Sequence, residues 1–164
     1  MLEMRLAAVR VELPNHTPIL LLQETGGARR TLPIYIGNAE AQAIAYSLQG
    51  VETPRPMTHD LMKDLLGELG ATVECVVITE LREGTFFAEI RLRSGGQRRT
   101  VSARPSDAVA LAVRVSAPMY AEEALVDAEG YILAEEITED DSSDSDELLS
   151  QFRDFIEGIK PEDF

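Results

Sequence analysis

Three polar stretches of the sequence combine side chains that could act on a phosphate group or hold a metal ion. In one of them, Arg104-Pro105-Ser106-Asp107 places a guanidinium, a hydroxyl and a carboxylate directly before an alanine- and valine-rich segment. Ser106 has a structural explanation as a helix cap, and Asp107 is favoured in a first helical turn by the helix dipole. Neither reason applies to Arg104, which can form a structural ion pair or bind a phosphate bidentately.

The other two polar stretches also open predicted helices. They contain Asn38, Glu40 and Gln42 in one case, and Thr58, His59 and Asp60 in the other. Helix capping by Asn38 and Thr58 is again the structural alternative to a functional site. A histidine such as His59 can act as a general base or as a neutral metal ligand. The only other histidine, His16, lies too far away to complete an HExxH or HxxxH spacing.

Hydrophobic patterning predicts the elements that must position these residues. Short runs rich in Val, Leu and Ile between turn residues predict strands, whereas apolar residues at i, i+3, i+4 and i+7 predict a helix. The predicted strands are 4–13, 18–24, 31–36, 72–81, 85–93, 99–103 and 119–122. The predicted helices are 38–48, 59–69 and 107–115. Each polar stretch therefore lies at the start of a helix.

The predicted elements form two similar blocks of three strands and a helix, at about residues 3–50 and 72–117. A shift of 67 residues places Glu40 on Asp107, and it superposes the apolar stripe Ala41, Ile44, Ala45 and Leu48 on Ala108, Leu111, Ala112 and Val115. We predict an α+β (mixed α/β) fold of internally duplicated β-β-β-α units, with a mixed or antiparallel sheet and an additional helix between the repeats. The alternative is two unrelated amphipathic helices, since alanine-rich stripes are common.

Length and composition predict one globular domain. The chain has 164 residues, of which 45% are hydrophobic, and we place the domain at residues 1–133. Residues 134–147 are predicted to be a flexible acidic linker, and residues 148–164 a short amphipathic helix and tail. The single cysteine, Cys75, excludes a disulfide framework and is predicted to be a packed core thiol. We expect a cytoplasmic protein without membrane contact, since no segment matches a membrane span or signal peptide.

The net charge of −14 is concentrated after residue 133. Residues 1–133 contain 13 Lys+Arg and 17 Asp+Glu, a balance of −4, whereas residues 134–164 contain 2 and 12, a balance of −10. A broad basic surface for nucleic acid is therefore not expected, and anion binding requires a local arginine cluster or a metal. There is no P-loop, GxGxxG or GxSxG motif, so nucleotide-triphosphate, dinucleotide and α/β-hydrolase chemistry have no support.

Three segments of the chain resemble the bifunctional nuclease family, a domain of bacteria and plants formerly classed as of unknown function. The segments are LPIYIGNAEAQAIA at 32–45, RPMTHDLM at 55–62, and SARPSDAVALAVR with PMYAEE at 102–123. The resemblance covers nearly all of residues 3–133, and the acidic tail resembles extensions of actinobacterial members. It implies an α/β domain with an internal repeat that cleaves phosphodiester bonds in RNA and DNA with little sequence preference. The polar positions that match the family are Asn38, Glu40, Gln42, Thr58, His59, Asp60, Arg104, Ser106 and Asp107.

The resemblance leads to the hypothesis of a metal-assisted nuclease. Asp107, with Glu40 or Asp60, would hold Mg²⁺ or Mn²⁺ through oxygen. Arg104 would bind the non-bridging phosphate oxygens, and His59 would activate water or protonate the leaving group. The helix N-termini, if they converge, would add phosphate-binding groups at Asn38, Gln42, Thr58 and Ser106.

A rival hypothesis is a non-catalytic regulatory or protein-interaction module whose polar cluster binds a small anion. It is favoured by the nearly neutral body and by the tail charge of −10, which would repel a polynucleotide. The acidic tail could instead dock a protein partner or occupy the basic site. A homodimer is expected, because the first hairpin and the final strand would otherwise leave exposed sheet edges.

Overall fold

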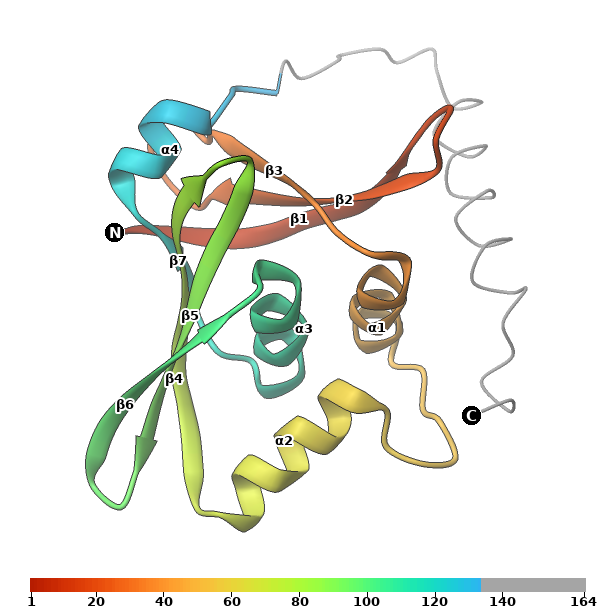
Figure 1. Cartoon of the computed structure of the whole chain (residues 1–164), viewed down its shortest axis with the longest axis vertical. Coiled ribbons are helices and arrows are strands. Elements are labelled where there is room, and N and C mark those ends of the chain that lie inside the picture. Colours follow the sequence, from red (N-terminus) through yellow and green to blue (C-terminus); the bar gives the residue numbers. More distant parts are fainter. Residues whose placement is uncertain (134–164) are drawn as a thin grey trace.

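The computed structural model describes residues 1–133, and the predicted linker and tail at 134–147 and 148–164 lie outside the described residues (Figure 1). The described part contains seven strands and four helices. The strands are β1 Leu2–Glu12, β2 Thr17–Glu24, β3 Thr31–Tyr35, β4 Ala71–Arg82, β5 Thr85–Ser94, β6 Gln97–Ala103 and β7 Met119–Ala121. The helices are α1 Asn38–Gln49, α2 Thr58–Glu68, α3 Pro105–Val115 and α4 Glu123–Glu129.

All seven strands form one mixed sheet in the order β3-β2-β1-β7-β4-β5-β6. Neighbouring strands are antiparallel except β4 and β7, which run parallel with Val76 opposite Met119. Figure 1 shows β1–β3 running across the top of the molecule and β4–β6 running down the left. Helices α1, α2 and α3 lie in the angle between these two arms, so the sheet brings the three helices together.

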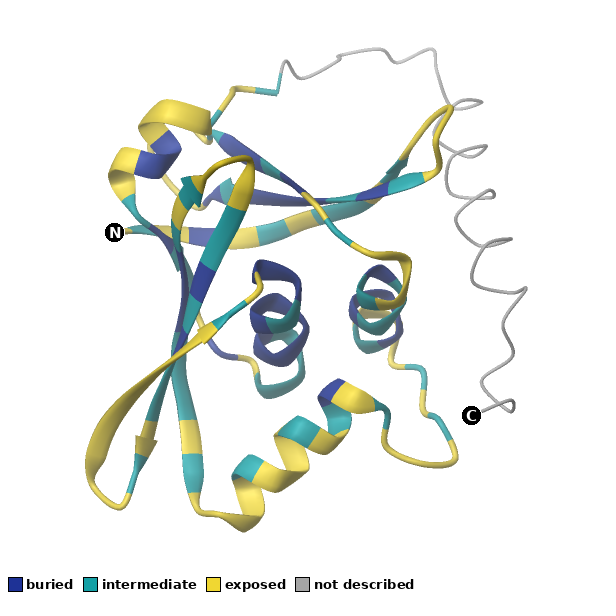
Figure 2. Ribbon diagram, in the orientation of Figure 1, coloured by how far each residue is buried: buried dark blue, intermediate teal, exposed yellow. Residues whose placement is uncertain are grey.

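The core lies between the inner face of the sheet and helix α3. Residues Ala108–Ala112 of α3 are all at most 1% exposed, and Figure 2 shows this helix as the most deeply buried of the four. Alanines at three of these five positions allow the helix to approach β4 and β5 closely. Leu111 and Ile44 are both fully buried, and burial of such a side chain contributes about 1.5–3 kcal/mol. The packing therefore fixes α3 and α1 firmly against the sheet.

The predicted elements are confirmed with ends that differ by one or two residues, and one helix was missed. Helix α4 was not predicted, because its seven residues give too short an apolar pattern. Leu48 was predicted in the buried stripe of α1 but is 57% exposed. The last turn of α1 instead buries Tyr46, which packs with Ala45 and Val51 in a small second cluster.

The predicted helix caps were wrong by one or two positions. The N-cap residues are Gly37, Met57 and Arg104, and none of them uses a side-chain cap. Asn38, Thr58 and Ser106 instead lie inside the first turn. The physical reason is that an acidic residue occupies the third position of all three helices and can satisfy free backbone N–H groups there.

The sheet edges are not the strands that the sequence suggested. Strand β7, predicted as an exposed final strand, lies in the middle of the sheet between β1 and β4. The edges are β3 and β6. The exposed-edge argument for a homodimer therefore does not apply to these strands, and the homodimer stays a prediction. Among residues 1–133, none of the helices has the length and apolar character of a membrane span.

The fold is a mixed α+β structure, as the sequence predicted. Three strands followed by a helix occur twice in chain order, and α2 lies between the two sets. The internal duplication itself stays a prediction, because the order of elements does not establish a common origin.

Candidate active site

The starts of helices α1, α2 and α3 meet at four side chains, which we call the Arg104 cluster: Glu40, His59, Arg104 and Asp107. Glu40 is in the first turn of α1, His59 in the first turn of α2, and Asp107 in the first turn of α3. Arg104 is the N-cap residue of α3 and directly follows strand β6. Residues that are far apart in the sequence are therefore positioned by one packed arrangement of helices.

Arg104 holds two carboxylates at once. Its Nε donates to Oδ2 of Asp107 at 2.7 Å, and its Nη2 donates to Oδ1 of Asp107 at 3.1 Å. The same Nη2 donates to Oε1 of Glu40 at 2.9 Å. The Arg104 side chain is 65% exposed, whereas those of Glu40 and Asp107 are 18% and 24% exposed. The guanidinium thus covers two partly buried carboxylates and presents its outer side to solvent.

His59 contacts the Arg104 cluster through Asp107. Its Nε2 lies 2.9 Å from Oδ1 of Asp107, and its side chain is only 8% exposed. This contact orients the carboxylate for Arg104. His59 of α2 therefore lies beside the start of α3, as convergence of these two helix N-termini requires.

Gly37 makes room for Glu40. A Cβ atom at Gly37 would lie 2.1 Å from Oε2 of Glu40, which means that this carboxylate folds back over the backbone at the N-cap. The backbone of Gly37 is extended, with φ −76° and ψ 159°, so its conformation would suit any residue. The glycine is required for space and not for an unusual dihedral angle.

Electrostatics favour the charged forms of Asp107 and Arg104. Burial alone would raise the pKa of Asp107, but hydrogen bonds from Arg104 and His59 outweigh it and hold the pKa below its usual range. The hydrogen bond to Asp107, with a further one to Glu40, raises the pKa of Arg104. The two carboxylates and the one guanidinium of the cluster sum to a charge of −1, with His59 left out of this count. The cluster is therefore not a ready-made anion site while Arg104 stays on both carboxylates.

Asp60, a predicted catalytic and metal-binding residue, is placed elsewhere. Its Oδ1 accepts from Nε of Arg114 at 2.6 Å, and its Oδ2 accepts from the backbone N–H of Met57 at 3.1 Å. Arg114 is 6% exposed and also donates to the backbone carbonyls of Ala110 and Ala43. Asp60 and Arg114 thus link all three helices as a structural brace. Arg114 was not predicted as a functional residue, because its only signal in the sequence is a charged residue in the last turn of an otherwise apolar helix.

The four predicted phosphate-binding residues around the cluster differ in position. Asn38 and Thr58 are exposed at the first positions of α1 and α2. Ser106 is buried in the first turn of α3, with 5% exposure. Gln42 donates to the hydroxyl of Tyr46 at 3.0 Å, one turn further along α1. Asn38 and Thr58 thus retain the exposure that a ligand contact requires, whereas Gln42 is engaged within its own helix.

The side chains only partly fit a divalent cation. Residues 1–133 contain no group of three or more His, Cys, Asp or Glu side chains arranged to hold a metal. Glu40 and Asp107 do converge, since both bond the same nitrogen of Arg104. Two carboxylates are a usual protein contribution to a magnesium site, which otherwise takes water and substrate oxygens. Of the three predicted ligands, Asp60 is bound to Arg114 and does not join this pair.

Comparison with known proteins identifies relatives along the whole chain. A family profile described as "Bifunctional nuclease domain" matches residues 20–133. An uncharacterized protein of Mycobacterium tuberculosis is 44% identical over 163 residues, which is 99% of this chain and 97% of the relative. The similarity to the mycobacterial protein therefore extends beyond the matched domain into residues 134–164.

More distant relatives are plant proteins. Bifunctional nuclease 2 of Arabidopsis thaliana is 28% identical over 123 residues, or 72% of this chain and 37% of the relative. Bifunctional nuclease 1 of Oryza sativa subsp. japonica is 26% identical over 118 residues, or 70% of this chain and 35% of the relative. This chain thus matches little more than a third of each plant protein.

Proposed function

The chain belongs to the bifunctional nuclease domain family, and we propose that it hydrolyses phosphodiester bonds of RNA and DNA, with little sequence preference, at the Arg104 cluster. The observation that carries this proposal is the convergence of three helix starts on one exposed arginine. A polynucleotide is the substrate class, and the cytoplasm remains the expected location.

Arg104 is the group placed to bind the scissile phosphate. Its hydrogen bonds use Nε and Nη2, so within residues 1–133 its Nη1 remains for a ligand. A guanidinium beside the phosphate stabilises the charge that develops on the non-bridging oxygens during hydrolysis. Asn38 and Thr58 stand at the neighbouring helix starts, where backbone N–H groups favour an anion.

A divalent cation would replace the positive charge of Arg104 beside Glu40 and Asp107. When Arg104 turns toward a phosphate, Glu40 and Asp107 lose their shared cation, and two partly buried carboxylates without a partner are unfavourable. Mg²⁺ or Mn²⁺ held by these two residues would restore the balance and supply the Lewis acidity common in nucleases. Of the predicted ligands, we keep Glu40 and Asp107 and exclude Asp60.

His59 acts as a positioning residue in this proposal. A general base must reach the water or the leaving group, but the His59 side chain is 8% exposed and its Nε2 faces Asp107. Its contribution is to fix the orientation of the Asp107 carboxylate. Replacement by Gln keeps a donor for Asp107, so His59→Gln should retain more activity than His59→Ala at every pH tested. If His59→Gln removed one limb of the pH–rate profile, His59 would instead be a group that transfers a proton.

The test is a cleavage assay on the highly purified full chain, with a series of Mg²⁺, Mn²⁺ and EDTA concentrations. Asp107→Asn is expected to reduce cleavage of RNA and DNA at least 100-fold, as expected for loss of a residue that stabilises the transition state. Asp64→Asn is the matched control, since Asp64 is 51% exposed on α2. Equal cleavage by wild type, Asp107→Asn and the control, after folding is checked by circular dichroism, would refute the proposal.

The second candidate is a non-catalytic anion-binding module that regulates a partner or docks a protein. The observation in its favour is that Arg104 bonds both Glu40 and Asp107, an arrangement typical of a structural network. This alternative predicts binding of inorganic phosphate or a partner without turnover in any metal. The same purified protein distinguishes the two, because a module of this kind binds an oligonucleotide or phosphate and leaves the phosphodiester intact.

A further inference from the structure

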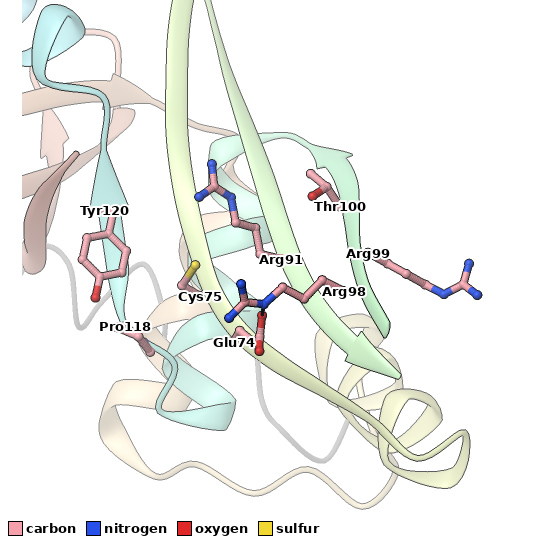
Figure 3. A pocket seen from close by; sticks show the side chains of 8 residues that line it. All are labelled: Glu74, Cys75, Arg91, Arg98, Arg99, Thr100, Pro118 and Tyr120. Carbon is pink, nitrogen blue, oxygen red and sulfur yellow. Dashed lines mark ion pairs between the residues drawn. The ribbon is translucent and has the colours of Figure 1, made fainter. Parts of the chain in front are cut away.

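A second basic feature lies on the outer face of the sheet, away from helices α1–α3. It is a hollow of about 420 Å³ lined by residues of β4, β5, β6, the turn before β7 and β7 itself. The lining residues are Glu74, Cys75, Arg91, Arg98, Arg99, Thr100, Pro118 and Tyr120. Figure 3 shows Arg91, Arg98, Cys75 and Tyr120 around the hollow, whereas Arg99 extends away from them. Cys75, predicted as a core thiol, is only partly buried here because its side chain faces outward.

The β5–β6 hairpin concentrates positive charge at this hollow. Residues 91–99 contain four arginines and no acidic residue. Arg93 lies directly opposite Arg98, and Arg91 directly opposite Thr100, on the same face of the hairpin. Like charges directly opposite each other are destabilising in a sheet. Glu74, which pairs with both Arg93 and Arg98, offsets this repulsion with a single negative charge.

Two acidic residues neutralise the arginines only in part. Glu74 accepts from Nε of Arg93 at 2.7 Å and forms an ion pair with Nε of Arg98 at 3.2 Å. Glu89 accepts from Nη2 of Arg91 at the longer distance of 3.4 Å. On this face of the hairpin, Arg91, Arg93 and Arg98 against two carboxylates leave an excess of one positive charge, in a chain whose net charge is −14. Such a local excess on an acidic protein indicates an anionic ligand.

We propose that this hollow binds a single-stranded polynucleotide outside the cleavage site. Arg91 and Arg98 contact phosphates, Thr100 offers a hydroxyl, and the Tyr120 ring supplies a surface on which a base stacks. A basic groove combined with an aromatic side chain is the usual means of binding single strands without sequence preference. The inference rests on the proposed function, because it takes the nuclease substrate as the ligand.

Strand β6 connects the two sites. Its second residue, Arg98, lies at the hollow, and the strand leads directly to Arg104, six residues further on, a distance of about 20 Å along a strand. It is also the edge strand, and residues 97–102 are all exposed. A single strand bound at the hollow can follow this edge to the Arg104 cluster, whereas a dinucleotide is too short to occupy both sites.

The first test measures binding of a fluorescent single-stranded oligonucleotide of about 20 nucleotides to the full chain by anisotropy, in EDTA and across a range of salt. Arg98→Gln and the pair Arg91→Gln with Arg98→Gln are compared with Arg10→Gln, which removes one positive charge, as Arg98→Gln does, but from the distant end of β1. We expect the double variant to bind at least 10-fold more weakly, and the slope of log K against log salt to fall by about 1.4, since each single-strand phosphate contact contributes about 0.7. Equal affinity and slope in the double variant and the Arg10→Gln control would overturn the proposal.

Cys75 offers a second, independent measurement. Because it is the chain's only cysteine and lines the hollow, a maleimide reports on this site alone. Burial raises the pKa of the Cys75 thiol, so labelling is slow, and its rate is measured with and without the oligonucleotide at one fixed pH. Labelling should slow at least three-fold when the oligonucleotide is saturating. An unchanged rate at saturation would contradict occupancy of the hollow.

Failure of this inference is distinguishable from failure of the proposed function. Binding in EDTA and protection of Cys75 require no cleavage, so both can succeed in a protein that is not a nuclease. Conversely, cleavage of a dinucleotide depends on the Arg104 cluster alone and should be the same in wild type and in the Arg91/Arg98 double variant. Loss of dinucleotide cleavage in the double variant would refute the separation of the two sites.

Discussion

The contacts of Asp107 predict how much each of its two partners contributes to the free energy of unfolding. Asp107 has two partners of very different exposure, since Arg104 is 65% exposed and His59 is 8% exposed. An exposed ion pair contributes about 0.2–1 kcal/mol, whereas a hydrogen bond to a charged group in a more buried position contributes about 1.5–3 kcal/mol. Most of the stabilisation by Asp107 should therefore come from His59, although the Arg104 contact is the more important one for activity.

Two variants separate these contributions. Asp107→Asn should lower the free energy of unfolding by about 1.5–3 kcal/mol, which corresponds to a Tm decrease of about 6–12 °C for a domain of this size. Arg104→Gln should cost at most about 1 kcal/mol, because it removes only the exposed partner. Both variants should lose cleavage activity to a similar extent.

The assay is urea unfolding followed by circular dichroism, with Asp64→Asn as the surface control. A double-mutant cycle of Asp107→Ala with His59→Ala, in which each variant removes the hydrogen bond, measures the coupling between the two residues directly. An Asp107→Asn variant as stable as the control, or an Arg104→Gln variant destabilised as much as Asp107→Asn, would refute this assignment of the stability.

Three further predictions follow from the geometry. Gly37→Ala should leave the free energy of unfolding within about 1 kcal/mol of wild type, because alanine suits this backbone conformation. The new Cβ should nevertheless displace Glu40 and reduce cleavage as much as Glu40→Gln does, and full activity would show that Glu40 is not needed in its present position. Asp60→Asn should cost about 3 kcal/mol in urea unfolding, since it leaves the buried Arg114 without its carboxylate, and an unaltered midpoint would exclude the brace. Folding lowers the pKa values of Asp107 and Asp60, so the stability that these carboxylates contribute is complete above about pH 5 and is lost as the pH falls through the lowered values. Unfolding midpoints measured from pH 7 to pH 2 should therefore decrease, and an increase on acidification would contradict this direction.

The fold was largely predictable because its elements have strong local patterns. The stripe of α3 and the alternation in the strands gave their positions to within two residues. Helix α4 escaped prediction because seven residues provide less than two turns of pattern. The position of β7 was also unpredictable, since a three-residue strand carries no signal that places it between β1 and β4.

The site was predicted in its residue types but not in its connections. The sequence indicated Arg104 and Asp107 as neighbours, because they are three residues apart around a helix start. It could not assign a partner to Asp60, since the choice of Arg114 depends on how three helices cross. Side-chain direction decides the matter here: His59 and Asp60 are adjacent in the sequence, yet one faces Asp107 and the other faces Arg114. The arginines of residues 91–99 were visible in the sequence, but only strand pairing brings Arg91 and Arg98 together at one hollow.

The central claim is that Arg104 and the carboxylates it holds cleave phosphodiester bonds. The most direct measurement is the rate of cleavage of a single-stranded oligonucleotide by wild type, Arg104→Gln, Arg104→Lys and Arg10→Gln, purified in parallel and assayed in Mg²⁺ and in Mn²⁺. We predict cleavage by wild type and Arg10→Gln, at least 100-fold slower cleavage by Arg104→Gln, and an intermediate rate for Arg104→Lys, which keeps the charge but loses the planar contact. Cleavage at equal rates by all four proteins, or by none in either metal, would contradict the account.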